Sequence, residues 1–269
     1  MVLEWGYEAG HPFDEHGAEF ARSGMPFFVC PGTSSWNAIA GRTSNCLGNV
    51  RNATKNGLKH GAGGVLNTDW GDNGHTQYLP VSYLGFAAGA ALPWCHEANR
   101  DEDFVSALDL HAFYDTARVM GRLSHDLGKA HELAGPAPHN STVLFYLLTQ
   151  SPDDPLPEGV TVDSLGEAGD CIASVIEPLE DARMDRDDAE ITRDEFANAA
   201  RMMLHACERG TAMLEGTAGS AEKSDELASG MRTILGEHRR LWSARNRVGG
   251  LQHSESVFEE RLREYARAS

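Results

Sequence analysis

The sequence contains no long apolar run and no Cys-x-x-Cys motif, and its first residues do not resemble a secretory signal. No stretch of about 18 apolar residues is present to cross a bilayer, and residues 1–5 lack the charged and apolar regions of a signal peptide. The five cysteines are widely spaced without a Cys-x-x-Cys motif, which argues against zinc-ribbon and dithiol redox chemistry. We therefore expect a cytoplasmic protein with reduced cysteines, no membrane partner, and no bound metal or cofactor.

Positive charge is also scarce. The 23 Lys and Arg residues face 40 Asp and Glu residues, which gives a formal net charge of −17 at pH 7. Proteins that bind nucleic acid neutralise phosphates with clustered Lys and Arg, whereas the basic residues here are interleaved with acids. We expect no nucleic-acid partner, and a neutral or cationic ligand fits the charge better.

Short apolar runs and glycine-rich turns dominate the first 100 or so residues. Four of these runs end at turn residues and are typical of buried strands, at residues 2–7, 26–30, 64–68 and 86–92. Helix-compatible stretches lie between the first three runs, at residues 15–23 and 45–57. Alternating strands and helices predict parallel pairing, so we expect an α/β fold in which residues 1–100 form half of a TIM-type barrel.

The remainder of the chain has apolar residues at helical spacing. This pattern predicts long helices within residues 104–133, 162–179, 193–214 and 224–244. We therefore divide the chain into a half barrel of about four parallel strands, residues 1–100, and a helical C-terminal region, residues 101–269. A half barrel leaves two open sheet edges, and we expect a homodimer that covers them.

Tryptophans and carboxylates follow the predicted strands. Trp5-Gly6-Tyr7-Glu8 ends the first, residues 31–36 follow the second, and Asp69-Trp70-Gly71-Asp72 follows the third. In a βα barrel these strand ends share the face that carries the active site. Flat aromatic walls beside carboxylates suit a saccharide, which has apolar C–H faces edged by hydroxyls. The alternative is that the tryptophans fill a core and the carboxylates cap the following helices.

Three ordered blocks of these residues resemble the catalytic barrel of a known family. The blocks are Trp5-Gly6-Tyr7-Glu8 with His11-Pro12-Phe13, Cys30-Pro31-Gly32-Thr33-Ser34-Ser35-Trp36-Asn37, and Thr68-Asp69-Trp70-Gly71-Asp72-Asn73-Gly74-His75 followed by Gln77. Together they resemble the C-terminal half of the barrel in family-20 glycoside hydrolases, the β-N-acetylhexosaminidases. The later segment Leu241-Trp242-Ser243-Ala244-Arg245-Asn246-Arg247, leading into Gly249-Gly250-Leu251, resembles the helical tail of bacterial members.

The resemblance implies a retaining hydrolase that removes terminal N-acetylglucosamine or N-acetylgalactosamine from β-linked glycosides, with the substrate's own acetamido oxygen as nucleophile. Such enzymes carry an Asp-Glu pair after the fourth barrel strand, and this chain begins at what resembles the fifth, so the pair is missing. The Asp-Glu dipeptides present lie near the starts of predicted helices, where acids favour the helix dipole, and they are Asp14-Glu15, Asp101-Glu102, Asp194-Glu195 and Asp225-Glu226.

The residues that remain define the predicted site. The expected catalytic carboxylates are Glu8, Asp69 and Asp72, and Asp69 beside Trp70 has the best environment for a general acid. The expected substrate-binding residues are Trp5, Tyr7, Trp36, Arg42, Asn67, Trp70, His75 and Trp94. One alternative is a non-catalytic carbohydrate-binding fragment of such an enzyme. A weaker alternative is a metal-dependent hydrolase that uses Asp69, Asp72 and His75.

Overall fold

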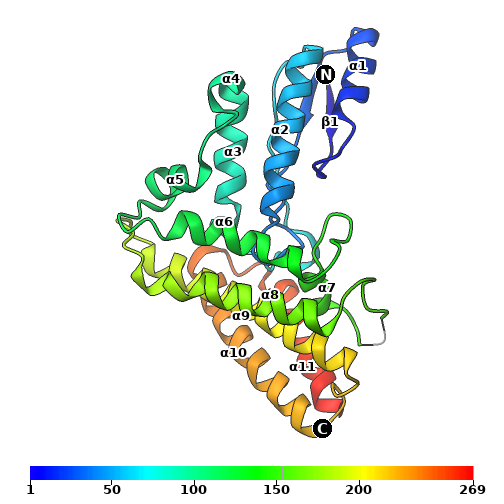
Figure 1. Ribbon diagram of the computed structural model, residues 1–269, viewed down its shortest axis with the longest axis vertical. Helices are drawn as coiled ribbons and strands as arrows, with labels where there is room; N and C mark the ends of the chain where they lie inside the picture. Colours follow the sequence, from blue (N-terminus) through cyan, green and yellow to red (C-terminus); the bar gives the residue numbers. More distant parts are fainter. Residues whose placement is uncertain (153, 269) are drawn as a thin grey trace.

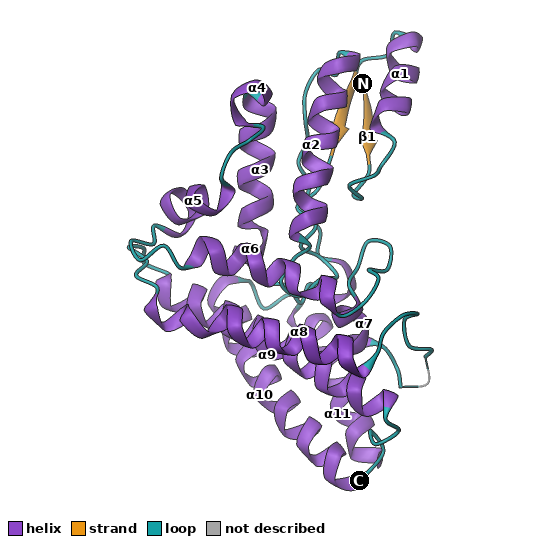
Figure 2. Cartoon of the chain, viewed as in Figure 1, coloured by secondary structure: helices purple, strands orange, loops and turns teal. Residues whose placement is uncertain are grey.

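The protein is mainly helical in a computed structural model that describes residues 1–152 and 154–268 (Figures 1 and 2). Residues 153 and 269, which both belong to the predicted helical region 101–269, lie outside the described residues. Two short strands, β1 (Val2–Trp5) and β2 (Phe27–Cys30), pair in parallel with Val2 opposite Phe27 and Trp5 opposite Cys30. The first two predicted strands are therefore confirmed, and each is shorter than the apolar run that predicted it.

The predicted four-stranded half barrel is wrong. The third run contributes two isolated parallel bridges, Val29 with Val65 and Gly32 with Thr68. The fourth run lies inside a helix, α3 (Tyr83–Trp94). A short apolar run does not distinguish a buried strand from a buried helix, and alanine and leucine in this run favour the helix. The expected α/β class is therefore wrong, and the fold is mainly helical. The sheet whose open edges a homodimer was expected to cover is also smaller than predicted.

Two helices cover one side of the small sheet. They are α1 (Phe13–Ser23) and α2 (Thr43–His60), and both end on a glycine with a left-handed backbone. Phe13 of α1 and Ala53 of α2 join Phe27 and Val29 of β2 in a small separate core. Burial of these apolar side chains holds the strand ends in place beneath the site described below.

The other helices form the larger part of the molecule. They are α4 (His96–Asn99), α5 (Phe104–Leu108), α6 (Met120–Ala130), α7 (Val143–Thr149), α8 (Val162–Ile176), α9 (Ala189–Leu214), α10 (Ala221–Arg245) and α11 (Leu251–Ala268). Consecutive helices pack together, α8 on α9, α9 on α10 and α10 on α11. Of these helices, α10 and α11 reach the end of the molecule opposite α1 (Figure 1). The main core extends from Ile39 to Tyr265. None of the described helices is both long and apolar enough to cross a membrane.

The predicted helix within residues 104–133 is broken. A π-helical turn (Asp109–Phe113) follows α5, and the chain then loops before α6 begins. The Asp115 carboxylate accepts hydrogen bonds from the backbone N–H groups of Ala117, Val119, Met120 and Arg183. A carboxylate that satisfies several backbone donors stabilises a turn in place of a continuous helix. By contrast, α8, α9 and α10 confirm the other predicted helices.

Candidate functional site

Four aromatic side chains meet where the strands end. Tyr7 is central, and its ring centroid lies 5.7 Å from that of Trp5, 5.1 Å from that of Trp36 and 6.4 Å from that of Trp70. The Trp70 indole N–H also donates a 3.0 Å hydrogen bond to the Tyr7 hydroxyl. The carboxyl ends of parallel strands lie at one edge of a sheet, which brings these residues together.

These rings line an open cavity of about 550 Å³, which we call the aromatic pocket. Its lining residues are Leu3, Trp5, Tyr7, Cys30, Trp36, Leu66, Thr68, Trp70 and Asp72. Trp5 is 64% exposed and Trp70 48% exposed, while Trp36 is 1% exposed and forms the closed side. Large exposed aromatic faces in a concave site are typical of ligand-binding surfaces.

Asp72 is the one carboxylate that lines the aromatic pocket. Its side chain is exposed and has no hydrogen-bond partner among the residues that the structure describes. Asp72 begins a short 3₁₀ turn (Asp72–Gly74), in which Asn73 has a left-handed backbone. Its oxygens are therefore available to accept hydrogen bonds from a ligand in the pocket.

Gly32 allows two of the rings to pack closely. A Cβ atom at this position would lie 2.5 Å from the Trp36 ring and 3.0 Å from the Tyr7 ring. The same backbone forms the bridge to Thr68, so the strand end and both rings converge on one glycine. A side chain here would displace the closed side of the aromatic pocket.

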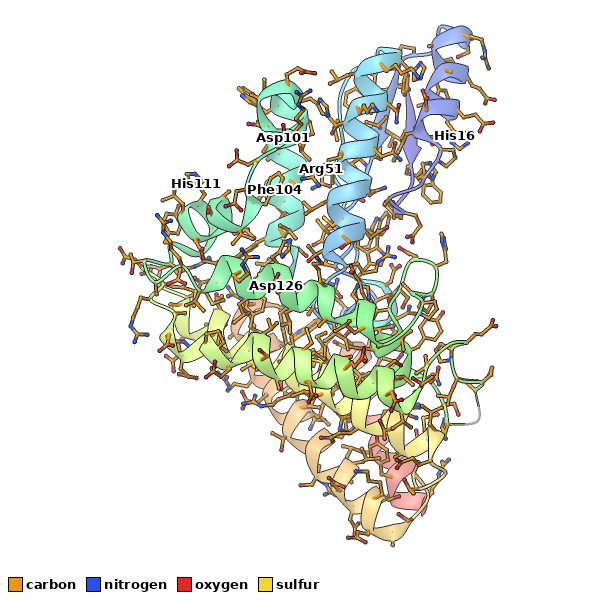
Figure 3. All side chains as sticks on the ribbon, viewed as in Figure 1. His16, Arg51, Asp101, Phe104, His111 and Asp126 are labelled. Atoms are coloured by element: carbon orange, nitrogen blue, oxygen red, sulfur yellow. The ribbon has the colours of Figure 1, made fainter. Side chains whose placement is uncertain are left out.

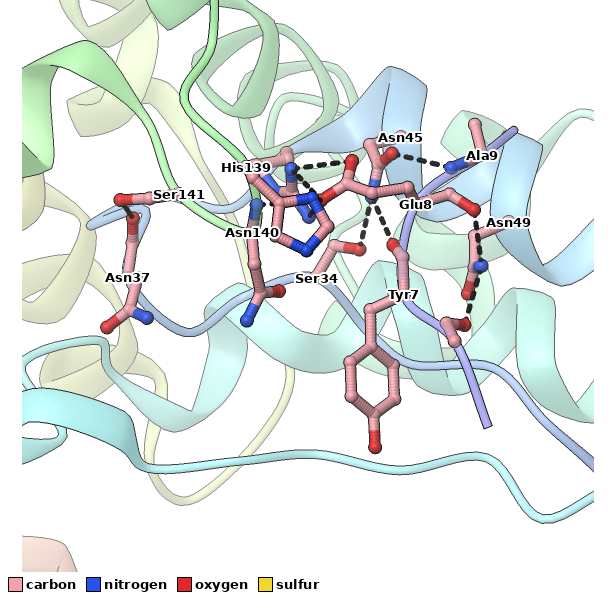
Figure 4. Close-up of polar contacts among 12 residues, drawn as sticks. Tyr7, Glu8, Ala9, Ser34, Asn37, Asn45, Asn49, His139, Asn140 and Ser141 are labelled. Atoms are coloured by element: carbon pink, nitrogen blue, oxygen red, sulfur yellow. Dashed lines mark hydrogen bonds and ion pairs between the residues drawn. The ribbon is translucent and has the colours of Figure 1, made fainter. Parts of the chain in front are cut away.

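An asparagine ladder on α2 fixes the loop that carries Tyr7 and Glu8 (Figure 4). Asn45 donates to the Tyr7 carbonyl, Asn49 to the Gly6 and Glu8 carbonyls, and Asn52 to two carbonyls further along the loop. The side-chain oxygen Oδ1 of Asn49 also accepts a hydrogen bond from the backbone N–H of Gly32. Spacings of four and three residues place the three amides on one helix face.

Glu8 is engaged by Arg42 and by a loop from the helical part. The Arg42 guanidinium donates three hydrogen bonds of 3.1 Å to the Glu8 carboxylate, and the Asn140 backbone N–H donates a fourth of 2.7 Å. The Asn140 side chain also accepts from the Trp36 indole N–H. Glu8 does not line the aromatic pocket, so its role in this geometry is to fasten the strand ends to the loop before α7.

Asp69 is held by hydroxyl groups. Its Oδ1 accepts hydrogen bonds from Thr33, Ser35 and Ser82, at 2.5, 2.7 and 3.2 Å. The side chain is exposed overall, which differs from the expected burial against Trp70, and it does not line the aromatic pocket. Its second oxygen has no hydrogen bond within the described residues and is open to solvent on this exposed side chain.

The remaining predicted site residues lie elsewhere. The Asn67 amide donates to the Gly85 carbonyl and packs against α3. His75 packs edge-on against Trp242, where burial lowers the pKa of its imidazole. Trp94 is 88% exposed at the end of α3 and lines a separate groove. The structure thus brings together Trp5, Tyr7, Trp36, Trp70 and Asp72, with Asp69, Glu8 and Arg42 adjacent to them in the chain or in the supporting network.

Sequence reasoning missed two groups of residues. One is the asparagine ladder, which the spacing of Asn45, Asn49 and Asn52 on a predicted helix would have signalled. The other is the group Glu4, His11 and His16, the one cluster of potential metal ligands within the described residues. The alternative metal site of Asp69, Asp72 and His75 does not form such a cluster.

No protein-family model matches the chain, and no curated protein shows significant similarity to it.

Proposed function

We propose that the protein binds the sugar ring of a β-linked amino-sugar glycoside in the aromatic pocket. The observation that carries this proposal is the set of three tryptophan rings around Tyr7, together with the free carboxylate of Asp72 on the same pocket. Indole and phenol faces pack against the apolar C–H face of a pyranose, and a carboxylate accepts its hydroxyl hydrogens. The motif resemblance narrows the sugar to N-acetylglucosamine or N-acetylgalactosamine.

The physical character of the pocket supports a neutral ligand of this size. A volume of about 550 Å³ is within the range of small-molecule sites and exceeds that of a single sugar ring. The apolar wall also offers a surface for the acetamido methyl group. The strongly negative net charge favours a neutral glycoside over an anionic one.

Tryptophan fluorescence and saturation-transfer NMR test the proposal directly. N-acetylglucosamine, N-acetylgalactosamine and their β-methyl glycosides are titrated into the wild type and into Trp70→Ala. We expect saturable binding by the wild type and at least about fivefold weaker binding by Trp70→Ala, because an aromatic contact of this kind is worth on the order of 1–3 kcal/mol. The matched control is Trp94→Ala, an exposed tryptophan outside the aromatic pocket, which should bind as the wild type does. Absence of saturation transfer from every amino sugar at millimolar concentration would overturn the proposal.

Hydrolysis of the bound glycoside is a second candidate function. It is favoured by the free Asp72 carboxylate on the pocket. Substrate-assisted cleavage needs a general acid for the leaving oxygen and a group that orients the acetamido nucleophile. Asp72 lines the aromatic pocket and is the carboxylate placed for one of these two roles, and Asp69 is the other carboxylate that the strand ends hold nearby.

A chromogenic β-N-acetylglucosaminide separates hydrolysis from binding alone. Turnover by the wild type that falls at least about a hundredfold in Asp72→Asn, with sugar binding kept, supports the hydrolase. Saturable binding with no turnover assigns the protein to carbohydrate recognition without catalysis. Turnover that is unchanged in both Asp72→Asn and Asp69→Asn eliminates these two carboxylates as catalytic groups.

A further inference from the structure

One carboxylate and two imidazoles converge on the side of β1 that faces away from the aromatic pocket. Glu4 Oε1 lies 2.7 Å from His11 Nε2 and 2.6 Å from His16 Nδ1. Leu3 and Trp5, the neighbours of Glu4 in the strand, line the aromatic pocket, and alternate residues of a strand point to opposite faces. The three residues therefore form a separate site, which we call the β1–α1 cluster.

The cluster is assembled from three different local structures. Glu4 belongs to β1, His11 to the loop that follows it, and His16 to the first turns of α1 (Figure 3 labels His16). Glu4 is buried, and the two histidine side chains are 21% and 38% exposed. The group thus has a buried anionic base and a solvent-facing side, which is the layout of a cation site with one open position.

The His11 ring is held rigidly. It lies so close to Gly6 that a Cβ atom on that glycine would be 2.2 Å from the ring, and it packs on the buried Phe13 ring at 4.5 Å. Asn52 of the asparagine ladder fixes the His11 carbonyl at 2.8 Å. Because the backbone and the ring are both fixed, little ordering is needed when a ligand binds.

The structure assigns a Zn²⁺ site to the β1–α1 cluster, with Glu4 Oε1, His11 Nε2 and His16 Nδ1 as ligands and water in the fourth position, and we propose it as such. Two imidazole nitrogens and one carboxylate oxygen suit zinc, which prefers a tetrahedral set of four ligands. In the metal-free arrangement both rings direct a nitrogen at the same carboxylate oxygen. To bind zinc, each neutral imidazole would take the tautomer that carries its proton on the other ring nitrogen, which leaves the lone pair of the facing nitrogen free for the ion.

The geometry needs only a small adjustment. The ligand atoms of the three residues lie within 4.8 Å of one another. Zinc–ligand bonds of about 2.0–2.1 Å in a tetrahedron require ligand atoms about 3.3 Å apart. The two contacts to Glu4 Oε1, at 2.7 and 2.6 Å, would each lengthen by less than about 1 Å, and the two imidazole nitrogens would take the same separation from each other. Glu15 and Glu19 of α1 act electrostatically on His16 and add negative potential at the open side.

Zinc here would fasten β1 to α1 at the loop that carries Tyr7 and Glu8. A site that is occupied in the folded state and absent in the unfolded chain adds its binding free energy to folding. The role is structural, and zinc would not contact the sugar, because its ligands face the side of β1 opposite the aromatic pocket.

Metal content and a spectroscopic probe test the site. The purified full chain is stripped with a chelator, dialysed against Zn²⁺ and then against buffer, and analysed for bound metal. We expect one zinc per chain, an upward shift of the midpoint of thermal unfolding on adding zinc, and the visible absorption bands of tetrahedral cobalt when Co²⁺ is substituted.

Two variants and one control identify the ligands. His16→Ala removes a ligand whose side chain is 38% exposed, and Glu4→Gln keeps the shape of the buried ligand. Each variant should bind zinc at least tenfold more weakly and lose the cobalt bands. His60→Ala is the matched control, since His60 also contacts a carboxylate, Asp14, but has no second histidine with it. It should bind as the wild type does. Substoichiometric zinc in the wild type, or unchanged binding in His16→Ala with circular dichroism of a folded protein, would overturn the site.

Discussion

Arg42 and Glu8 form an ion pair between a buried cation and a half-buried anion, with side chains 3% and 32% exposed. The two partners are therefore not equivalent. Loss of Arg42 leaves a carboxylate that water and the Asn140 N–H still reach, whereas loss of the Glu8 charge leaves a guanidinium without its counter-ion in the interior. The pair joins the strand ends to the loop before α7, so it fixes the position of the aromatic pocket relative to the helical part.

Glu8→Gln should lower the free energy of unfolding by about 2 kcal/mol. Removing one partner of a buried pair costs more, and the value is reduced here because Glu8 is partly solvated. Urea denaturation followed by circular dichroism measures the change. Lys59→Ala removes the exposed pair with Asp14 and should cost less than about 1 kcal/mol. Equal effects of the two substitutions would contradict the importance assigned to the Glu8–Arg42 pair.

Asn49→Ala should destabilise the protein by about 2–4 kcal/mol. The substitution leaves the Gly6 and Glu8 carbonyls and the Gly32 N–H without their partner, and Asn49 is fully buried, so water does not replace it readily. Chemical denaturation is again the measurement. Lys55→Ala, an exposed change on the same helix, should stay within about 0.5 kcal/mol of the wild type. A cost below about 1 kcal/mol for Asn49→Ala would show that the ladder does not hold the loop.

The sequence correctly predicted that residues at the ends of the first three strand segments come together, although the fold predicted around them was wrong. Trp5, Tyr7, Trp36 and Trp70 meet because strand direction alone brings the carboxyl ends to one edge. The half-barrel prediction was wrong at α3. The apolar run there forms backbone hydrogen bonds within a helix instead of pairing with a neighbouring strand.

Packing against distant parts of the chain decided the rest of the site. His75 follows Asp72 by only three positions, yet its ring packs against Trp242, a residue far along the chain, and not in the aromatic pocket. The Asn67 side chain likewise contacts α3, where it donates to the Gly85 carbonyl. Local spacing carries no information on such contacts, and the Glu4, His11 and His16 cluster likewise depends on how α1 returns to β1.

Gly32→Ala should destabilise the protein by about 1–3 kcal/mol and impair the aromatic pocket. The added Cβ overlaps the Trp36 ring, which is fully buried and cannot move outward freely. Thermal unfolding measures the stability, and near-ultraviolet circular dichroism reports the displaced tryptophan. Gly236→Ala is the matched control. Gly236 lies within α10, and a Cβ atom there would have no neighbour within 4 Å, so the substitution should stabilise the protein by about 0.5–1 kcal/mol. A neutral Gly32→Ala would show that the rings tolerate a side chain there.

The free energy of unfolding should fall as the pH is lowered from 6.5 toward 4, because of three buried histidines in the helical part. Burial lowers the pKa of His131, His205 and His238 to about 4, below the ordinary value of 6.5. Between pH 6.5 and 4 the unfolded chain binds protons at these positions and the folded protein does not. Stability is therefore fully present above pH 6.5 and is lost as the pH falls through this window, by on the order of 1–3 kcal/mol per histidine.

His238 offers a way to assign part of that loss. It lies between the Tyr78 and Ser254 hydroxyls, with Glu255 raising its pKa and His75 lowering it. Unfolding by urea at pH 7.5 and pH 5 gives the change in stability for the wild type and for His238→Gln, which keeps polar contacts but does not titrate. The variant should lose less stability on acidification than the wild type, because one buried imidazole no longer resists protonation. An equal loss in both proteins, or greater stability at pH 5, would contradict the sign derived for the buried histidines.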